Sequence, residues 1–248
     1  MEPIAVVTGA DRGLGLALTA GLLARGWCVF AGQYLPEWPA LEELAASYQR
    51  LLRIVPLDVG DTASVQAAAD AVGANVDGVD LLINNAGVNS RTSTGEIREP
   101  QDYLEMQRLY NVNALGPVRV VEAFLPLLER GQMRRLCFVS SEAGSINRAQ
   151  RTAWFGYCSS KAALNMGVRL LFNRLRPQGY TFRLYHPGWV RSYMGGTKST
   201  VADLEPEEAA IPALAYFLRD RGHDPHVATR SDEERLVLRD YQGVEWPW

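Results

Sequence analysis

The sequence predicts an α/β fold in which a mostly parallel sheet is covered by helices on both faces. Short β-branched runs alternate with helical apolar patterns along the chain. The first of these runs, 4–7, leads into a glycine-rich turn and then into a helix. The 248 residues, 47% of them hydrophobic and 21% charged, suit one large domain with a substantial core. We therefore expect a single domain over 1–248.

The first half of the chain has the order that a parallel sheet with helical crossovers requires. We expect strands at 4–7, 28–33, 52–57 and 81–83, and helices at 16–25, 41–50 and 62–76. Three of the strands lead into polar or glycine-rich residues, namely the run 8–15 (TGADRGLG), Asp58, and the run 84–87 (NNAG). Parallel sheets bind ligands beyond the carboxyl ends of their strands, so we expect a binding site where these residues meet.

The second half continues the alternation, with longer connections. A helical stretch at 103–130 is interrupted by Gly116-Pro117 and by Pro126. We expect strands at 135–140, 180–185 and 236–239, helices at 157–172 and 206–219, loops at 142–155 and 191–203, and an aromatic tail that ends in Trp246-Pro247-Trp248. No internal repeat or linker divides the chain.

Charge and composition exclude several classes of function. The net charge is -3 and no long basic block is present, so we expect neither a nucleic-acid partner nor an anionic membrane partner. No run of eighteen apolar residues and no secretory leader is evident, which predicts a soluble cytoplasmic protein. Cys28, Cys137 and Cys158 are expected to be small hydrophobic residues. His223 and His226 are expected to be solvated loop residues, so no metal site is predicted.

The glycine-rich turn is the first candidate site. Glycines allow a tight turn and a close approach to a pyrophosphate, whose charge the N–H groups of the following helix would receive. The spacing is G-x-x-x-G-x-G and differs from the general dinucleotide fingerprint. Taken alone, the motif leaves open that the turn only joins a strand to a helix.

The second candidate is the pair Tyr157 and Lys161 on the expected helix 157–172. Residues four apart share a helix face, so the phenol would lie one turn from the ammonium. A nearby positive charge favours the phenolate and lowers the pKa of a tyrosine, which suits acid–base chemistry. The alternative, a solvated helix face, is not excluded by the pair alone.

Taken together and in order, the motifs resemble those of the classical short-chain dehydrogenase/reductase family. The runs SSEAGSI and HPGWVRSYMGG further resemble the C-factor-like carbonyl reductase branch. The motifs that carry the resemblance are T8-G9-x-x-x-G13-x-G15, Leu57-Asp58-Val59, N84-N85-A86-G87, Asn113 before x-x-Gly, Ser141, Y157-x-x-x-K161 and P187-G188. The resemblance implies a Rossmann-type three-layer α-β-α sandwich, with a seven-stranded sheet and three helices on each side. It also implies a homodimer or homotetramer.

The resemblance assigns four catalytic residues. Tyr157 would exchange the proton with the substrate oxygen, and Lys161 would lower the tyrosine pKa and bind the nicotinamide ribose. Ser141 would hydrogen-bond the substrate oxygen, and Asn113 would hold a water that connects Lys161 to solvent. The family pattern favours Asn113 and Ser141 over their neighbours Asn111 and Ser140, because a glycine, Gly116 or Gly144, follows three residues later.

A nicotinamide cofactor is implied, with NADP preferred and NAD possible. The second strand ends in Gln33-Tyr34 without the acid that would repel a 2′-phosphate, and Arg12 resembles the basic residue that binds this phosphate in many members. Arg12 as an exposed turn residue is the alternative. The residues assigned to the cofactor are Gly9, Arg12, Gly13, Leu14, Gly15, Gln33, Asp58, Val59, Asn85, Ala86, Gly87, Tyr157, Lys161, Pro187, Val190 and Ser192.

The sequence thus predicts an NADP(H)-dependent oxidoreductase that transfers a hydride between the nicotinamide and a carbonyl or hydroxyl group. The substrate loops are expected at 142–156 and 189–204, with the aromatic tail nearby, which favours a small, largely apolar or aromatic substrate. Four loop arginines favour an anionic substrate instead: Arg91, Arg148, Arg151 and Arg191. The alternative function is a cofactor-binding sensor or regulatory protein with little turnover. A sensor has no chemical need for all four catalytic residues.

Overall fold

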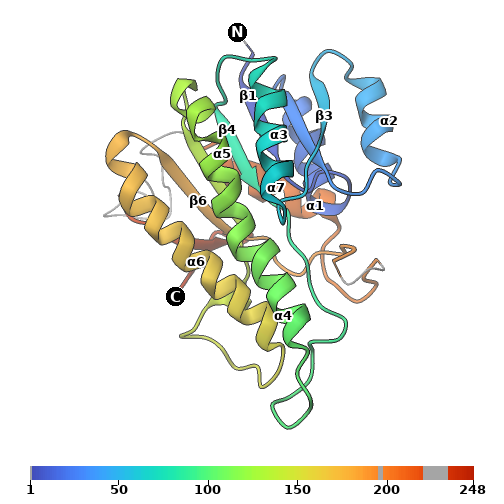
Figure 1. Ribbon diagram of the computed structural model, residues 1–248, viewed down its shortest axis with the longest axis vertical. Helices are drawn as coiled ribbons and strands as arrows, with labels where there is room; N and C mark the ends of the chain where they lie inside the picture. Colours follow the sequence, from blue (N-terminus) through green and yellow to red (C-terminus); the bar gives the residue numbers. More distant parts are fainter. Residues whose placement is uncertain (1, 195–197, 220–233) are drawn as a thin grey trace.

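The computed structural model describes residues 2–194, 198–219 and 234–248 (Figure 1). His223, His226 and part of the predicted loop 189–204 lie outside these residues. Within the described part, eight strands form one sheet in the order β3-β2-β1-β4-β5-β6-β7-β8. The strands are β1 (Ile4–Val7), β2 (Cys28–Gln33), β3 (Leu52–Pro56), β4 (Leu81–Asn84), β5 (Arg135–Val139), β6 (Thr181–His186), β7 (Leu238–Asp240) and β8 (Glu245–Trp246).

The sheet confirms the predicted α/β class and its mostly parallel strands. All pairs from β3 to β7 are parallel, and only β8 pairs antiparallel, with Leu238 opposite Trp246. The seven expected strands are therefore present, and the aromatic tail adds an eighth. The strand order reverses between β1 and β4, whose next neighbours lie on opposite sides. A crevice at the carboxyl edge is expected at such a reversal.

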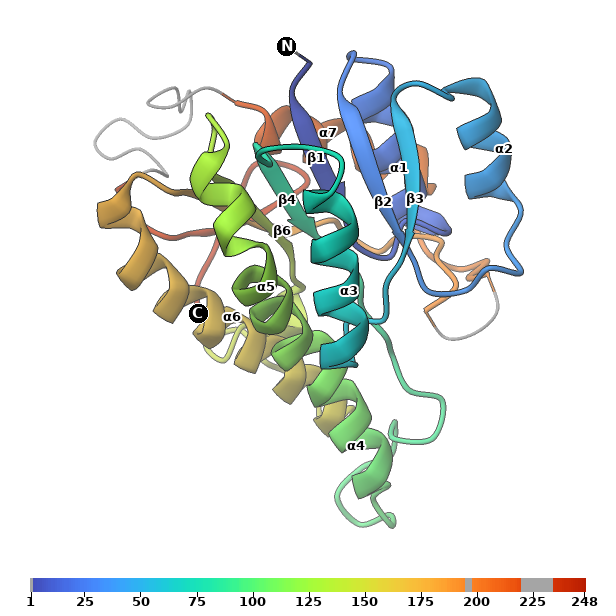
Figure 2. The ribbon, with the colours of Figure 1, turned by 45° about the horizontal axis from the view of Figure 1, so that its top comes forward.

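Helices cover both faces of the sheet, as the two views make plain (Figure 1 and Figure 2). One face carries α3, α5 and α6, whose buried residues form one core cluster with Phe30, Phe138 and Phe182. The other carries α1, α2 and α7, whose residues pack with Val7, Ile83 and Tyr185. The helices are α1 (Gly13–Leu23), α2 (Ala40–Ser47), α3 (Thr62–Gly73), α4 (Tyr103–Tyr110), α5 (Gly116–Arg130), α6 (Phe155–Leu175) and α7 (Pro206–Phe217). Side chains that alternate across the strands supply both cores.

The predicted interruption at Gly116-Pro117 does not break the helix. A π turn, η1 (Asn111–Leu115), joins α4 directly to α5. Pro117 lies in the first turn of α5, where a missing N–H costs little. Gly116 allows close packing, because a Cβ there would lie 3.0 Å from Cγ2 of Val59. The π turn thus passes the end of β3, and π turns of this kind often mark functional sites.

Candidate active site

The turn between β1 and α1 depends on glycines. Gly9 and Gly13 have φ values of +63° and +57°, a region that favours glycine. A Cβ on Gly15 would lie 2.0 Å from the carbonyl oxygen of Gly9, so no side chain fits there. Among the described residues no side chain caps the first turn of α1, and Leu14 lies buried in it. The uncapped N–H groups can therefore receive a pyrophosphate.

Thr8 fastens this turn to the end of β4. Its Oγ1 accepts hydrogen bonds from the backbone N–H groups of Asn85 and Ala86, at 3.1 and 3.0 Å. The Asn85 side chain donates from Nδ2 to the carbonyl oxygens of Thr8 and Gly9, at 3.0 Å each. The run that ends at Gly87 is thus held beside the glycine turn.

The ends of β2 and β3 bring further predicted residues to the same edge. The Gln33 Nε2 atom is buried and has no hydrogen-bond partner in the described part of the chain, so it fits a ribose hydroxyl or a phosphate oxygen. Asp58 Oδ1 accepts from Gly60 N at 2.7 Å, and the Val59 carbonyl accepts from Arg119 at 2.5 Å. A dinucleotide could therefore bind with its pyrophosphate at the start of α1 and a ribose or phosphate oxygen at the Gln33 amide.

Arg12 lies in an aromatic cluster that the sequence did not predict. Its guanidinium carbon is 4.7 Å from the centroid of the Trp38 ring and 5.9 Å from that of Tyr193. The two rings meet edge to face at 4.5 Å. Ser192, next to Tyr193, faces Gly13, because a Cβ on that glycine would lie 3.8 Å from its Cβ. The segment after β6 includes Pro187, Val190 and Ser192. It therefore packs against the glycine turn between β1 and α1.

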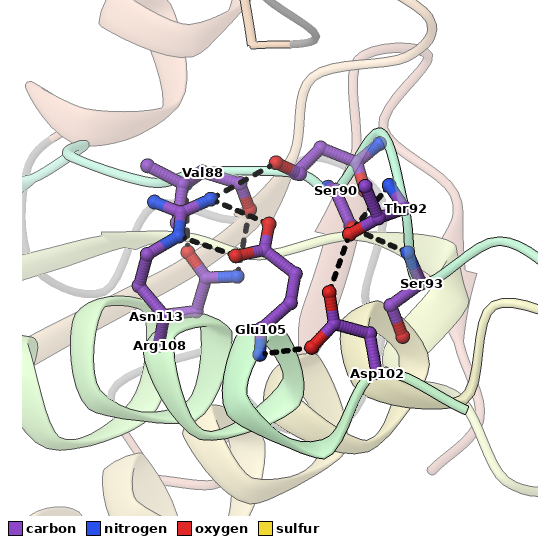
Figure 3. A network of polar contacts seen from close by, with 9 residues as sticks. Val88, Ser90, Thr92, Ser93, Asp102, Glu105, Arg108 and Asn113 are labelled. Atoms are coloured by element: carbon purple, nitrogen blue, oxygen red, sulfur yellow. Dashed lines mark hydrogen bonds and ion pairs between the residues drawn. The ribbon is translucent and has the colours of Figure 1, made fainter. Parts of the chain in front are cut away.

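Asn113 lies in the π turn and is fully buried. Its Oδ1 accepts from Val88 N at 2.8 Å, and its Nδ2 donates to the Val88 carbonyl at 2.9 Å (Figure 3). Nδ2 also donates to Ser160 Oγ at 3.0 Å. A single amide thus joins the loop after β4, the π turn and α6.

The loop that follows Val88 is tied to α4 by the network in Figure 3. Ser90 Oγ accepts from the N–H groups of Thr92 and Ser93 at 3.0 and 2.7 Å. Thr92 donates to Asp102 at 2.8 Å, and Asp102 also caps α4. These bonds hold the loop after Val88 against α4, which leads directly into the π turn with Asn113.

Lys161 is 3% exposed, and its Nζ donates to the Val139 carbonyl at 3.2 Å. Burial lowers its pKa to about 8. A Cβ on Gly87 would lie 3.3 Å from Asn113 Oδ1, 3.5 Å from Lys161 Nζ and 3.7 Å from Met194 Cε. The ammonium, the amide of the π turn and the loop after β6 therefore converge on Gly87.

Tyr157 is half-buried near the start of α6, and Lys161 Nζ lies 5.9 Å from the centroid of its ring. Burial raises the pKa of Tyr157 to about 12, and the Ser141 hydroxyl lies within hydrogen-bond reach of the phenol. The charge of Lys161 is not among the largest effects on this pKa. The structure thus brings the predicted tyrosine, lysine and serine together, with burial as the dominant effect on each titrating group.

The two neighbours not chosen from the sequence have structural partners. Ser140 is buried and donates to Asn165 Oδ1 at 2.6 Å. Asn111 donates to the Gly60 carbonyl at 2.9 Å and accepts from Arg119 at 3.0 Å. Ser140 thus contacts α6 and Asn111 contacts α5, and neither of these bonds involves Tyr157.

The second predicted substrate loop is closed at its ends by backbone bonds. Asp203 N and Leu204 N both donate to the Trp189 carbonyl at 3.1 Å. In the first loop, Trp154 has φ +67° directly before α6, and its ring meets that of Tyr157 edge to face at 6.5 Å. An aromatic side chain therefore stands next to the predicted proton donor.

The aromatic tail packs against the first substrate loop. Ser145 Oγ donates to the Pro247 carbonyl at 2.6 Å, and Asn147 N donates to the Trp248 carbonyl at 2.7 Å. Trp246 donates from Nε1 to Asp240 Oδ2 at 2.8 Å. The far end of the chain thus contributes to the site.

The loop arginines are less available to an anion than the sequence suggested. Arg151 pairs with Glu142, and Arg191 pairs with Glu205 at 2.9 Å. The guanidinium of Arg148 lies 4.8 Å from the centroid of the Trp246 ring. Two of these arginines are therefore ion-paired, although Glu205 also pairs with Lys198 at 2.9 Å.

Sequence reasoning missed Glu142, His186 and Trp38. Ser141 donates to Glu142 Oε2 at 2.5 Å, and His186 Nε2 lies 3.7 Å from the same oxygen. The only available signal was a charged residue directly after the predicted serine. His186 and Trp38 come into place only through the fold.

The described residues include neither a membrane-spanning helix nor a cluster of metal ligands. No helix there is both long enough and apolar enough to cross a membrane. No group of three or more His, Cys, Asp or Glu side chains in this part of the chain could hold a metal ion.

The fold and the residues at its carboxyl edge define an oxidoreductase of the nicotinamide-dependent α/β class. A model of the short chain dehydrogenase family matches residues 3–202, and the chain belongs to that family. The family prediction made from the motifs is thus confirmed.

Relatives and solved structures agree with this family. C-signal of Myxococcus xanthus is 39% identical over 171 residues, which cover 68% of this chain and 93% of the relative. An NADPH-bound carbonyl reductase from chicken fatty liver superposes with a TM-score of 0.84 and 30% identity, covering 100% of this chain and 94% of that one. A short-chain dehydrogenase/reductase of Burkholderia multivorans with bound NADP gives a TM-score of 0.83 and 31% identity, with both chains fully covered.

Proposed function

We propose that this enzyme is an NADP(H)-dependent carbonyl reductase or alcohol dehydrogenase for small, largely apolar or aromatic substrates. The observation that carries the proposal is the convergence of Asn113 and Lys161 on Gly87, with Tyr157 and Ser141 beside them. A proton donor, a cation and a hydroxyl thus meet at the edge where the glycine turn would hold a dinucleotide.

Each catalytic side chain has a role that its surroundings support. The bound nicotinamide supplies or takes the hydride. Tyr157 donates the proton to the substrate oxygen in reduction, and its raised pKa keeps it protonated at neutral pH. Ser141 stabilises the negative charge that develops on that oxygen. Lys161, with a pKa of about 8, is mostly charged at neutral pH and would bind the nicotinamide ribose beside Gly87.

NADP(H) is favoured over NAD(H) by the charges at the end of β2. Arg12 is held over Trp38, and neither Gln33 nor Tyr34 at the end of β2 is acidic. An arginine binds a phosphate through charge-assisted hydrogen bonds, whereas a ribose 2′-hydroxyl gains less. The NADPH and NADP named with the two similar structures agree with this preference.

An apolar or aromatic substrate is favoured by the loops around Tyr157. Trp154, Met194 and Trp246 belong to the segments that surround the site, and the ion pairs of Arg151 and Arg191 leave less positive charge for an anion. We therefore expect neutral ketones and aldehydes to be reduced faster than charged analogues.

The test combines cofactor titration with a panel of carbonyl compounds. We expect NADPH to bind more tightly than NADH, and we expect reduction of reactive dicarbonyls, quinones or aromatic aldehydes. Tyr157→Phe should abolish turnover and keep NADPH binding. Wild-type turnover by that variant would remove Tyr157 from its role.

The alternative function is a cofactor-binding sensor or regulatory protein, and the name of the relative C-signal favours keeping it. Tight NADPH binding without turnover across the whole panel would support it.

We also propose a homo-oligomer, a homodimer or homotetramer, assembled through α4, α5 and α6. In both views α6 lies beside the continuous helical stretch formed by α4 and α5 (Figure 1 and Figure 2). These helices carry exposed apolar residues. The largest are Tyr103, Leu104, Tyr110, Met166 and Leu170. Large exposed apolar side chains are frequent at protein interfaces. Leu170→Glu should lower the mass measured by light scattering, whereas Ile211→Glu on α7, 67% exposed, should not.

A further inference from the structure

Glu142 lies directly after Ser141 and takes part in a small charged cluster. Its Oε2 accepts a hydrogen bond from Ser141 Oγ at 2.5 Å, and its Oε1 accepts one from Arg151. His186 Nε2 lies 3.7 Å from Oε2, beyond hydrogen-bond distance. The charged or titratable groups that face this cluster are Arg151 from the same loop, Tyr157 and Cys158 from α6 and His186 from β6, with Asp240 of β7 and Lys161 of α6 behind the histidine.

The carboxyl of Glu142 is ionised at neutral pH. Burial alone would raise its pKa, but the hydrogen bonds from Ser141 and Arg151 outweigh this and lower the pKa below its ordinary value. An ionised carboxylate can only accept hydrogen bonds, so the proton between the two side chains belongs to Ser141.

A serine hydroxyl has one proton and two lone pairs. In Ser141 the proton goes to Glu142, and one lone pair accepts from Ala143 N at 3.1 Å. The remaining lone pair can accept a proton from Tyr157 or from a bound alcohol. A carbonyl oxygen offers no proton, so it can bind Ser141 only if the bond to Glu142 breaks.

We propose that Glu142 is a positioning residue that sets the direction of the Ser141 hydrogen bond, so that Ser141 accepts from an alcohol more readily than it donates to a carbonyl. The proposal rests on the proposed function, since it concerns the serine that faces the substrate oxygen. Charge-assisted bonds are about twice as strong as neutral ones, so a neutral carbonyl competes poorly for the Ser141 proton. A developing oxyanion carries charge and competes well.

Glu142→Gln should reverse this direction, because Arg151 orients the amide. The guanidinium has only donors, so it should hold the carbonyl oxygen of the new side chain. The amide NH₂ then faces Ser141 and donates to its Oγ. The Ser141 proton becomes free for a substrate carbonyl.

The experiment measures dissociation constants of an unreactive pair of complexes. The probes are 4-nitrobenzaldehyde bound to the NADP⁺ complex and 4-nitrobenzyl alcohol bound to the NADPH complex, because neither combination can transfer a hydride. In Glu142→Gln we expect the aldehyde to bind about two- to tenfold more tightly, the range of one neutral hydrogen bond, and the alcohol to bind no better than in the wild type. Equal changes for both probes, no change, or no saturable binding of the alcohol to the wild type would overturn the proposal.

Two further variants separate this role from a general effect on structure. Glu2→Gln makes the same chemical change in an exposed ion pair with Arg50, and it should leave both constants unchanged. In the double variant Glu142→Gln with Arg151→Leu the amide is no longer oriented, so the gain in aldehyde affinity should shrink. If the gain in aldehyde affinity persists in full without Arg151, the amide does not act through the proposed direction of the Ser141 hydrogen bond.

The binding measurement also separates this inference from the proposed function. Turnover of carbonyl substrates with unchanged probe constants in Glu142→Gln would leave the function standing and remove the inference. If the dissociation constants shift as predicted but no carbonyl compound is turned over, the inference stands and the proposed function is removed.

Discussion

Asn113 donates a hydrogen bond from Nδ2 to the Ser160 hydroxyl of α6, 3.0 Å away. Ser160 in turn donates to the Tyr157 carbonyl at 2.8 Å. The π turn therefore contacts the helix that carries Tyr157 and Lys161 through one buried side chain. A change at Asn113 should act on the chemistry and on the fold together.

Asn113→Ala should destabilise the protein by about 2 to 4 kcal/mol, because it leaves both backbone groups of Val88 without their partner. It should also lower kcat at least tenfold, since the ammonium of Lys161 loses its polar neighbour near Gly87. Urea denaturation and steady-state kinetics measure the two effects. Asn111→Ala is the matched control, with a loss of stability and nearly unchanged kcat.

Ser141→Ala should lower kcat by about 10² to 10³, the usual cost of one donor to a developing oxyanion. Ser140→Ala should act on stability instead, by about 1 to 3 kcal/mol, because the Asn165 oxygen is left buried without its donor. Kinetics and thermal unfolding of the two variants separate the roles. A large loss of kcat in Ser140→Ala with an active Ser141→Ala would reverse the assignment.

Arg12→Ala should weaken NADPH binding about tenfold or more and leave NADH binding nearly unchanged, since only NADPH carries the 2′-phosphate. Arg12→Lys keeps the charge but loses the flat guanidinium over Trp38, so an intermediate affinity is expected. Fluorescence titration with both cofactors measures the difference. Arg25→Ala, at the other end of α1, is the control, and equal losses for both cofactors in Arg12→Ala would argue against phosphate binding.

The sequence was sufficient for most of the strands and for the residues at their carboxyl ends. The runs 4–7 and 28–33 match β1 and β2 residue for residue, because short apolar runs between turns have few other interpretations. Gly116-Pro117 led to the prediction of a break in the helix. Proline is tolerated in the first turn of a helix, where Pro117 lies, so the helix continues. The backbone continues through a π turn that no local pattern predicts.

Side-chain partners were the part that could not be predicted. The Arg12 cluster joins residues 38 and 193, and the Glu142 cluster joins residues 151 and 186, which only the folded chain brings together. The expected effect of Lys161 on Tyr157 relied on helix spacing alone. Burial, which depends on every element packed around the site, outweighs it.

Lys161→Met should make the protein more stable at neutral pH while abolishing activity. Burial lowers the pKa of Lys161 from its ordinary 10.5 to about 8, so the charged form costs about 3 kcal/mol in the folded state below pH 8. The loss of the bond to the Val139 carbonyl offsets about 1 kcal/mol of this, which leaves a gain of about 2 kcal/mol.

The pH dependence gives this prediction its sign. Between about pH 8 and 10.5 the unfolded chain keeps a proton on Lys161 that the folded chain has lost, so the stability of the wild type rises with pH relative to the variant. The advantage of Lys161→Met should therefore be full at pH 7, vanish near about pH 9.5 and become a disadvantage of about 1 kcal/mol above about pH 10.5, where only the lost bond to the Val139 carbonyl remains. Urea denaturation of both proteins at pH 7, 9 and 10.5 measures it. Parallel stability curves across this range would mean that the buried ammonium carries no such cost.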